Sequence, residues 1–275
     1  MKAICDICPR ACEIEEGALG FCRARTNQNG TVVCQNYARV TAIALDPMEK
    51  KPLRRFHPGS RILSVGSYGC NMNCAYCQNC EISMARAEYV EWTEIPPEEL
   101  IARAEALQPR GNIGIAFTYN EPLIGYEYVM DCAKLAKARG LSVVLVTNGM
   151  INSDPWQKLL PYVDAANIDL KTFSREGYRS LGGDRDTVLE AISLAAERIH
   201  VEVTTLAVPG FSDDEALLRE EAAWMAGESC EIALHLSHFF PRHRMKNAEP
   251  TPVETVRRLA VAAREFLPYV YEGNL

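Results

Sequence analysis

The chain has 275 residues with 48% hydrophobic and 24% charged side chains, enough for one large α/β domain with a small appendage. Its formal net charge of −7 argues against a nucleic-acid partner bound mainly through phosphate contacts. The sequence has neither an apolar run of about 18 residues nor the apolar core of a signal peptide, so we expect a cytoplasmic protein with no membrane partner.

The first 52 residues are predicted to form a Cys-rich, metal-binding extension. Nine of the 11 cysteines lie within the first 80 residues, and in a reducing compartment such crowding indicates metal binding rather than disulfides. A short, turn-rich segment buries little apolar surface, so a metal would supply its folding energy. The candidate ligands, suited to a Zn2+ site or to an auxiliary iron–sulfur cluster, are Cys5, Cys8, Cys12 and Cys22. Nothing near them in the sequence indicates redox work, which favours zinc.

Residues 31–45 alternate in part between apolar and polar side chains, which predicts a short hairpin or strand. Residues 46–53 contain Pro47 and Pro52, which break regular structure, so this segment is interpreted as a linker. The main domain is therefore expected to span residues 53–275.

Strands and helices alternate through the main domain. The predicted strands are residues 61–66, 112–117, 141–146, 165–170, 201–208 and 231–237. The predicted helices are residues 97–107, 122–139, 153–160, 184–198, 212–225 and 252–266. We expect Ser153 or Asp154, and Ser212, to cap two of these helices, and Gly140 to end the second. Near-continuous apolar strands joined by helices predict a parallel sheet, either open and doubly wound or a partial barrel.

The loop after the first of these strands carries Cys70, Cys74 and Cys77 in the spacing C-x3-C-x2-C. Thiolates suit iron–sulfur clusters, zinc and Cu(I). Three of them can hold one side of a cubane cluster and leave its fourth iron open to a substrate. Cys80 offers a fourth thiolate, so a closed structural zinc site is the alternative interpretation.

Polar residues also follow the other strands, as expected where chemistry gathers at the carboxyl ends of barrel strands. A zwitterionic amino acid needs an acceptor for its ammonium group and a donor for its carboxylate. Glu121 and Lys171 can play these parts, although Glu121 also suits a helix N-terminus. His235 is predicted at the barrel mouth, which makes it a candidate binding residue.

The cysteine loop, with the aromatic Tyr76 before its last cysteine, resembles the cluster motif of the radical S-adenosylmethionine (SAM) superfamily. The resemblance implies a partial (β/α)6 TIM-type barrel and a [4Fe-4S] cluster held by Cys70, Cys74 and Cys77. It further implies that SAM binds the open iron, with Tyr76 near the adenine, and is cleaved to a 5′-deoxyadenosyl radical that abstracts hydrogen. An electron donor such as flavodoxin or ferredoxin would supply the reducing electron.

Two further matches concern SAM binding. The segment 119–122 occupies the place of a Gly-Gly-Glu-Pro motif that binds the SAM amino group, and 147–149 and 169–171 resemble segments of the pyruvate formate-lyase activating enzymes. A narrower resemblance, carried by 46–53, 57–60, 77–79 and the N-terminal cysteines, is to the AmmeMemoRadiSam-system radical SAM proteins. The cofactor-binding residues expected on these grounds, besides Tyr76 and His235, are Asn120, Glu121, Thr147, Asn148, Asp169 and Lys171.

The sequence thus supports a radical SAM oxidoreductase with either of two targets. One is a glycine Cα–H on a partner protein, which would make the chain an activase of a glycyl radical enzyme. The other is a small molecule or a peptide side chain that is modified directly. The alternative from another class is a zinc-stabilised binding module without catalysis, which gives the polar strand ends no role.

Overall fold

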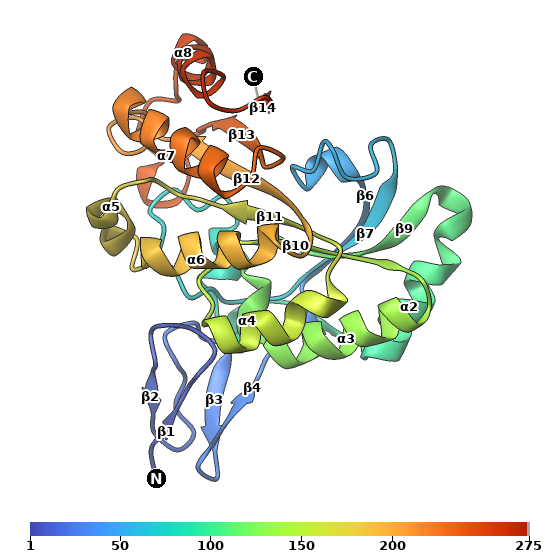
Figure 1. Cartoon of the computed structure of the whole chain (residues 1–275). Helices are drawn as coiled ribbons and strands as arrows, with labels where there is room; N and C mark the ends of the chain where they lie inside the picture. Colours follow the sequence, from blue (N-terminus) through green and yellow to red (C-terminus); the bar gives the residue numbers. More distant parts are fainter. Residues whose placement is uncertain (274–275) are drawn as a thin grey trace.

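The computed structural model describes residues 1–273 and contains one large sheet with helices along its outer side (Figure 1). The eight strands follow the order β14-β13-β12-β11-β10-β9-β7-β6, and every neighbouring pair is parallel except β6 with β7. The strand order is linear, so the sheet stays open between β6 and β14. This arrangement confirms the predicted partial TIM-type barrel.

All six predicted strands are present, with ends that shift by at most two residues. They are β7 (Arg61–Gly66), β9 (Asn112–Phe117), β10 (Ser142–Thr147), β11 (Ala165–Asp169), β12 (His200–Ala207) and β13 (Ala233–His238). Their apolar runs are buried on both faces, as in β10, where Val143, Val144 and Leu145 are fully buried. The sheet has two further strands at its edges, β6 (Ala42–Pro47) and β14 (Val270–Gly273). The first overlaps the hairpin or strand predicted at 31–45, whereas β14, only four residues long, was not predicted.

The predicted helices are also present. They are α2 (Pro97–Ala106), α3 (Tyr126–Ala138), α4 (Ser153–Leu159), α6 (Arg185–Ala196), α7 (Glu215–Glu228) and α8 (Val253–Ala263), with the 3-10 turn η4 (Pro122–Gly125) before α3. Gly140 follows the end of α3 with a φ of +68°, as expected. Within residues 1–273, no helix is long and apolar enough to cross a membrane.

Two predicted helix caps were wrong. The N-cap of α7 is Asp214, whose carboxylate accepts a hydrogen bond from the Leu217 amide, and Ser212 instead bonds the strand end at Leu206 and Val208. The N-cap of α4 is Asn152, without a side-chain capping bond. Two short helices, α1 (Cys80–Ser83) and α5 (Arg175–Ser180), had no periodic signal in the sequence because each spans less than two turns.

The N-terminal residues form two small antiparallel pairs beside the large sheet, drawn in blue in Figure 1: β1 (Ala3–Ile4) with β2 (Glu13–Ile14), and β3 (Arg25–Gln28) with β4 (Thr31–Cys34). A third short pair joins β5 (Arg39–Val40) to β8 (Thr93–Glu94). Asn29 and Gly30 turn between β3 and β4 with φ angles of +54° and +79°, which suits a two-residue hairpin turn. The hairpin thus begins earlier in the chain than the predicted 31–45.

Residues 46–53 are not a linker, contrary to the sequence interpretation. Asp46 and Pro47 end β6, and the next residues, 48–53, form a floor segment that begins with the 3-10 turn η1 (Met48–Lys50). Met48 and Leu53 are 0% exposed and pack against side chains of four strands: Ile62, Ala116, Val144 and Ala165. The floor segment therefore closes the end of the barrel opposite the cysteine loop, and a separate unit at 1–52 remains a prediction.

Candidate active site

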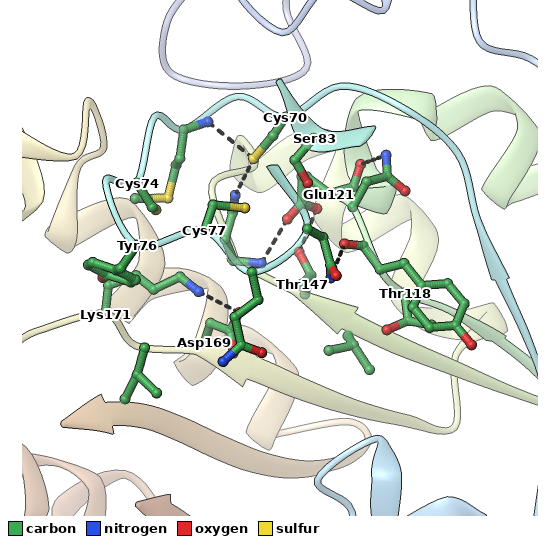
Figure 2. A pocket seen from close by; sticks show the side chains of 18 of the residues that line it. Cys70, Cys74, Tyr76, Cys77, Ser83, Thr118, Glu121, Thr147, Asp169 and Lys171 are labelled. Carbon is green, nitrogen blue, oxygen red and sulfur yellow. Dashed lines mark hydrogen bonds and ion pairs between the residues drawn. The ribbon is translucent and has the colours of Figure 1, made fainter. Parts of the chain in front are cut away.

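A pocket of about 270 Å³ opens at the carboxyl ends of the parallel strands (Figure 2). It brings together most of the sequence-predicted site residues: Cys70, Cys74, Tyr76, Cys77, Asn120, Glu121, Thr147, Asn148, Asp169 and Lys171. Figure 2 shows the three cysteine side chains near one another, with Glu121 and Thr147 toward one side and Lys171 and Asp169 toward the other. Six of the strands contribute through residues near or just beyond their carboxyl ends, as in barrel enzymes.

The cysteine loop is held close to the N-terminal extension. Gly69, with a φ of +87°, opens the loop, and a Cβ there would lie 2.4 Å from the Cys22 carbonyl oxygen, so only glycine fits. Asn120 fixes the same stretch, because its side chain donates to the Gly69 carbonyl at 3.1 Å and accepts from the Ser67 amide at 2.9 Å. Asn120 thus positions the cysteine loop.

The cysteine thiols lie in an environment that can accept a cluster. The Met72 amide and the Asn148 side-chain amide donate to Cys70 Sγ at 3.4 and 3.7 Å. Burial raises the pKa of the Cys70 thiol and raises that of Cys74 to about 11, although Lys171 opposes the latter shift. These thiols therefore stay protonated until a metal replaces the protons.

Glu121 lies on the opposite wall and is only 3% exposed. Oε1 accepts from the Leu123 amide at 2.9 Å and Thr147 Oγ1 at 2.7 Å, and Oε2 accepts from the Asn148 amide at 2.8 Å. Burial raises the pKa of Glu121 to about 7 despite these bonds. Each carboxylate oxygen can accept about two bonds, so Oε2 retains capacity for one further donor. Glu121 is both the N-cap of η4 and a candidate acceptor for an ammonium group.

Asp169 ends β11 and forms an ion pair with Lys171 two residues later, with Lys171 Nζ 2.6 Å from Asp169 Oδ2. Burial disfavours the charge on Lys171, but the Asp169 carboxylate outweighs it and, together with the Cys74 and Tyr76 groups, raises the lysine pKa. Lys171 therefore stays charged in the pocket. It supplies a fixed positive charge for a carboxylate or a cluster.

Tyr76 carries the clearest sign of a missing partner. Its hydroxyl is buried and has no hydrogen-bond partner among residues 1–273, while its ring lies 5.8 Å from that of Phe211. A buried hydroxyl without a partner is costly, so a bound ligand would relieve it. Three thiols, a half-buried ammonium group, a buried carboxyl group and this hydroxyl form a donor set that fits a [4Fe-4S] cluster with SAM.

The structure does not bring His235 to the pocket. His235 Nε2 lies 2.5 Å from Glu202 Oε2, and His200 Nε2 lies 2.9 Å from Glu202 Oε1. Ser237, two residues later on the same face of β13, lines the pocket instead. The sequence indicated which face of β13 points toward the pocket, but not how far along the strand the pocket begins. For the same reason it missed two pocket residues, Leu206 on β12 and Ser237 on β13.

The remaining candidate cysteines also lie outside the pocket. Cys5, Cys8, Cys12 and Cys22 line a separate cavity of about 10 Å³ in the N-terminal extension, and Cys80 begins α1. Among residues 1–273, no three His, Cys, Asp or Glu side chains are gathered closely enough to hold a single metal ion. This holds for both cysteine sets. A cluster spaces its thiolates more widely than an ion does, because iron and sulfide lie between them.

Comparisons with known proteins agree with this site. Residues 64–221 match the family described as the Radical SAM superfamily. An uncharacterized protein of Methanocaldococcus jannaschii, MJ0808, is 39% identical over 100% of this chain and 82% of its own length. A pyruvate formate-lyase-activating enzyme of Clostridium pasteurianum is 28% identical over 60% of this chain and 69% of its own. A structure of TYW1 with a lysine-pyruvate adduct bound has a TM-score of 0.54 at 15% identity, over 82% of this chain and 84% of that one.

Proposed function

Because this chain belongs to the radical SAM superfamily, we propose that it cleaves SAM reductively at a cluster held by Cys70, Cys74 and Cys77. When bound, the [4Fe-4S] cluster and SAM supply a 5′-deoxyadenosyl radical that abstracts a hydrogen atom from a substrate. The observation that carries this proposal is that the three thiols share one pocket with the half-buried ammonium group of Lys171 and the buried carboxyl group of Glu121. A structural zinc site has no use for these two groups.

The chain's own residues would bind and orient the cosubstrate. Glu121 Oε2 has room for one more donor, which suits the SAM ammonium group, and Thr147 and Asn148 fix the carboxyl group in place. The positive charge of Lys171 would bind the SAM carboxylate, and Asp169 holds the Lys171 ammonium group in the pocket. Tyr76 lines the same pocket, where the adenosyl group would fit, and its buried hydroxyl has no hydrogen-bond partner among the described residues.

For the substrate, we propose a glycine Cα–H on a partner protein, which would make this chain an activase. Relatives named as activating enzymes support this choice, including the one from Clostridium pasteurianum and a putative glycyl-radical enzyme activating enzyme of Methanocaldococcus jannaschii. The sheet is open between β6 and β14, which leaves a side of the barrel that strands do not close. The reductant proposed is a low-potential, one-electron carrier such as flavodoxin or ferredoxin.

The first experiment is anaerobic reconstitution with iron and sulfide, followed by visible and EPR spectra with and without SAM. We expect the wild type to give a cluster signal that shifts when SAM is added. In Cys70→Ala/Cys74→Ala/Cys77→Ala, this SAM-responsive signal and SAM cleavage should both be lost. The matched control is Cys230→Ala, because Cys230 is exposed and lies outside both cysteine sets. A colourless wild type that holds only zinc would overturn the proposal and favour the binding module.

A second experiment separates the two substrate classes. Source cells are grown on glycine deuterated at Cα, and their extract is divided by filtration into a protein fraction and a small-molecule fraction. An activase gives 5′-deoxyadenosine heavier by one deuterium with the protein fraction, together with a glycyl radical EPR signal. Deuterium transfer from the small-molecule fraction alone would contradict the activase and support direct modification.

A further inference from the structure

The N-terminal extension gathers four cysteines from separate turns around one small cavity. Cys5, Cys8 and Cys22 are buried, Cys12 is half-buried, and all four line this cavity, whereas Cys34 does not. Burial raises the pKa of Cys22 and raises that of Cys8 to about 11. The strands around the cavity are only two to four residues long. Such a segment has little core of its own and gains stability from a metal centre.

Arg25 provides an independent sign that something anionic belongs there. It lines the same cavity and is 3% exposed, and its Nε–H has no hydrogen-bond partner within residues 1–273. Its two terminal nitrogens bond both oxygens of Glu127, at 2.7 and 2.8 Å. The guanidinium group is thus held rigidly with one buried donor unused. Hydrogen bonds from such donors to cluster sulfur atoms are a principal means of tuning a cluster.

The N-terminal cavity lies directly beside the pocket that contains Cys70, Cys74 and Cys77, called the radical site below. Asn71, the neighbour of Cys70, lines it, and the Asn71 side chain contacts the Cys8 thiol. Asn148, which donates to Cys70 Sγ, also donates to Asn71 Oδ1 at 2.9 Å. Arg10, between two of the N-terminal cysteines, donates from Nε to the Asn71 carbonyl at 2.7 Å. A single residue, Asn71, therefore lies between the two cysteine sets.

We propose that Cys5, Cys8, Cys12 and Cys22 hold a second iron–sulfur cluster, which passes electrons to the cluster of the radical site. The relay step rests on the proposed function, whereas the metal site itself does not. One electron leaves a reduced donor protein, which is oxidised by one electron, and moves through the N-terminal site to the radical site. There it enters SAM, where one C–S bond breaks to give methionine and the adenosyl radical.

Two contacts favour a cluster over the zinc ion that the sequence alone favoured. The unused Nε–H of Arg25 lies at the cavity, and Asn71 links the cavity to Cys70 through Asn148. The sequence showed no redox group near the N-terminal cysteines, because the contact with Asn71 spans more than 60 residues of chain. A metal beside the radical site, bridged by a hydrogen-bonded asparagine, is placed for electron transfer.

The first test measures metal content and needs no enzymatic activity. Cys70→Ala/Cys74→Ala/Cys77→Ala keeps the N-terminal set intact, and after anaerobic reconstitution we expect it to hold about four iron ions per chain. Reduction with dithionite should give an EPR signal that SAM does not alter. Zinc in place of iron, or no metal, would overturn the second cluster. If this variant holds iron but the EPR signal of the wild type does not change with SAM, the result would contradict only the proposed function.

The second test addresses the relay. In Cys5→Ser/Cys8→Ser/Cys12→Ser/Cys22→Ser, we expect reduced flavodoxin to lose its ability to drive SAM cleavage, while dithionite, a small reductant, still drives it. Iron content should fall to that of the radical site, and thermal unfolding shows whether the variant is folded. Equal rates with flavodoxin in the variant and the wild type would overturn the relay. If the variant does not fold, freeze-quench EPR of the wild type decides: the N-terminal signal must appear before SAM is cleaved.

Discussion

Buried ionisable residues in this chain differ in whether a charged partner accompanies them. Lys171 has the Asp169 carboxylate at 2.6 Å and stays charged. Glu221 on α7 is fully buried, and its one side-chain partner among the described residues is Thr205. Thr205 Oγ1 also lies 3.0 Å from the Leu170 carbonyl. A hydroxyl has one proton to donate, so when Thr205 donates it to that carbonyl, Glu221 must be protonated to bond Thr205.

The first prediction concerns the pH dependence of stability. Burial raises the pKa of Glu221 to about 8 from its ordinary 4.5, against a smaller opposing effect of Thr205. The pKa of Glu221 is higher in the folded than in the unfolded protein. Its contribution to the free energy of unfolding is therefore fully present below about pH 4.5 and is lost as the pH rises through about 8, by a few kcal/mol in all. Glu221→Gln should remove that decline. Urea unfolding from pH 5 to 9 measures it, with the exposed Glu220→Gln as control; parallel curves for Glu221→Gln and wild type would contradict it.

The second prediction concerns the pocket charge. Lys171→Met keeps the length of the side chain but removes the ammonium group, leaving Asp169 without its partner. We expect SAM to bind the reconstituted protein more weakly by about 1.5–3 kcal/mol, or roughly 10- to 150-fold. Anaerobic titration calorimetry measures the Kd, with iron content checked beforehand. The control is Lys158→Met, which changes an exposed lysine on α4. An unaltered Kd would remove Lys171 from the SAM site.

At the scale of elements, β9 and β10 leave no room for a side chain at one point where they pair. Gly114 pairs with Ser142, and a Cβ on Gly114 would lie 1.9 Å from the Ser142 carbonyl oxygen. Both strands carry pocket residues just beyond their ends, so their spacing sets the distance between Glu121 and Asn148. Gly227 in the exposed part of α7 offers the contrast, since nothing lies within 4 Å of its Cβ position.

The third prediction compares these two glycines. Gly114→Ala should destabilise the protein by about 3 kcal/mol, because the two strands must separate to admit the methyl group. Gly227→Ala should stabilise it by about 0.5–1 kcal/mol, because alanine is the better helix former. Thermal unfolding of the two variants measures both effects. A neutral Gly114→Ala would mean that the strands can shift freely, contrary to the tight packing described.

On the scale of the whole molecule, the sequence predicts the strands and helices that have a regular local pattern. It misses features that depend on contacts between residues far apart in the chain. The six central strands were predictable because each is a nearly continuous apolar run, and the pocket residues because they follow those strands. His235 was wrongly placed in the pocket because the alternation of side chains along a strand shows which face a residue lies on, but not how near it lies to the end of the barrel. The floor segment was mistaken for a linker because prolines mark its local conformation, whereas Met48 and Leu53 find their partners on four separate strands.

The fourth prediction tests the floor segment. Leu53 is fully buried against side chains of four strands, so Leu53→Ala should cost about 2–5 kcal/mol of unfolding free energy. The same substitution in an exposed linker would leave the free energy of unfolding almost unchanged. Chemical denaturation measures the difference, and the exposed Ile43→Ala on β6 serves as control. A cost for Leu53→Ala equal to that of the control would restore the linker interpretation.

The contacts of the N-terminal extension also set an order of events during synthesis. Arg10 bonds the Gly182 carbonyl, and Asn152 bonds the Asp6 carbonyl, so the first residues of the chain cannot settle until about 180 more have been made. At roughly 5–20 residues per second, that interval is on the order of 10–30 s. Throughout it, the contacts that join the N-terminal cysteines to the barrel are not yet formed. Under the proposal of a second cluster, metal delivery to these cysteines would therefore begin on the ribosome, before the barrel exists.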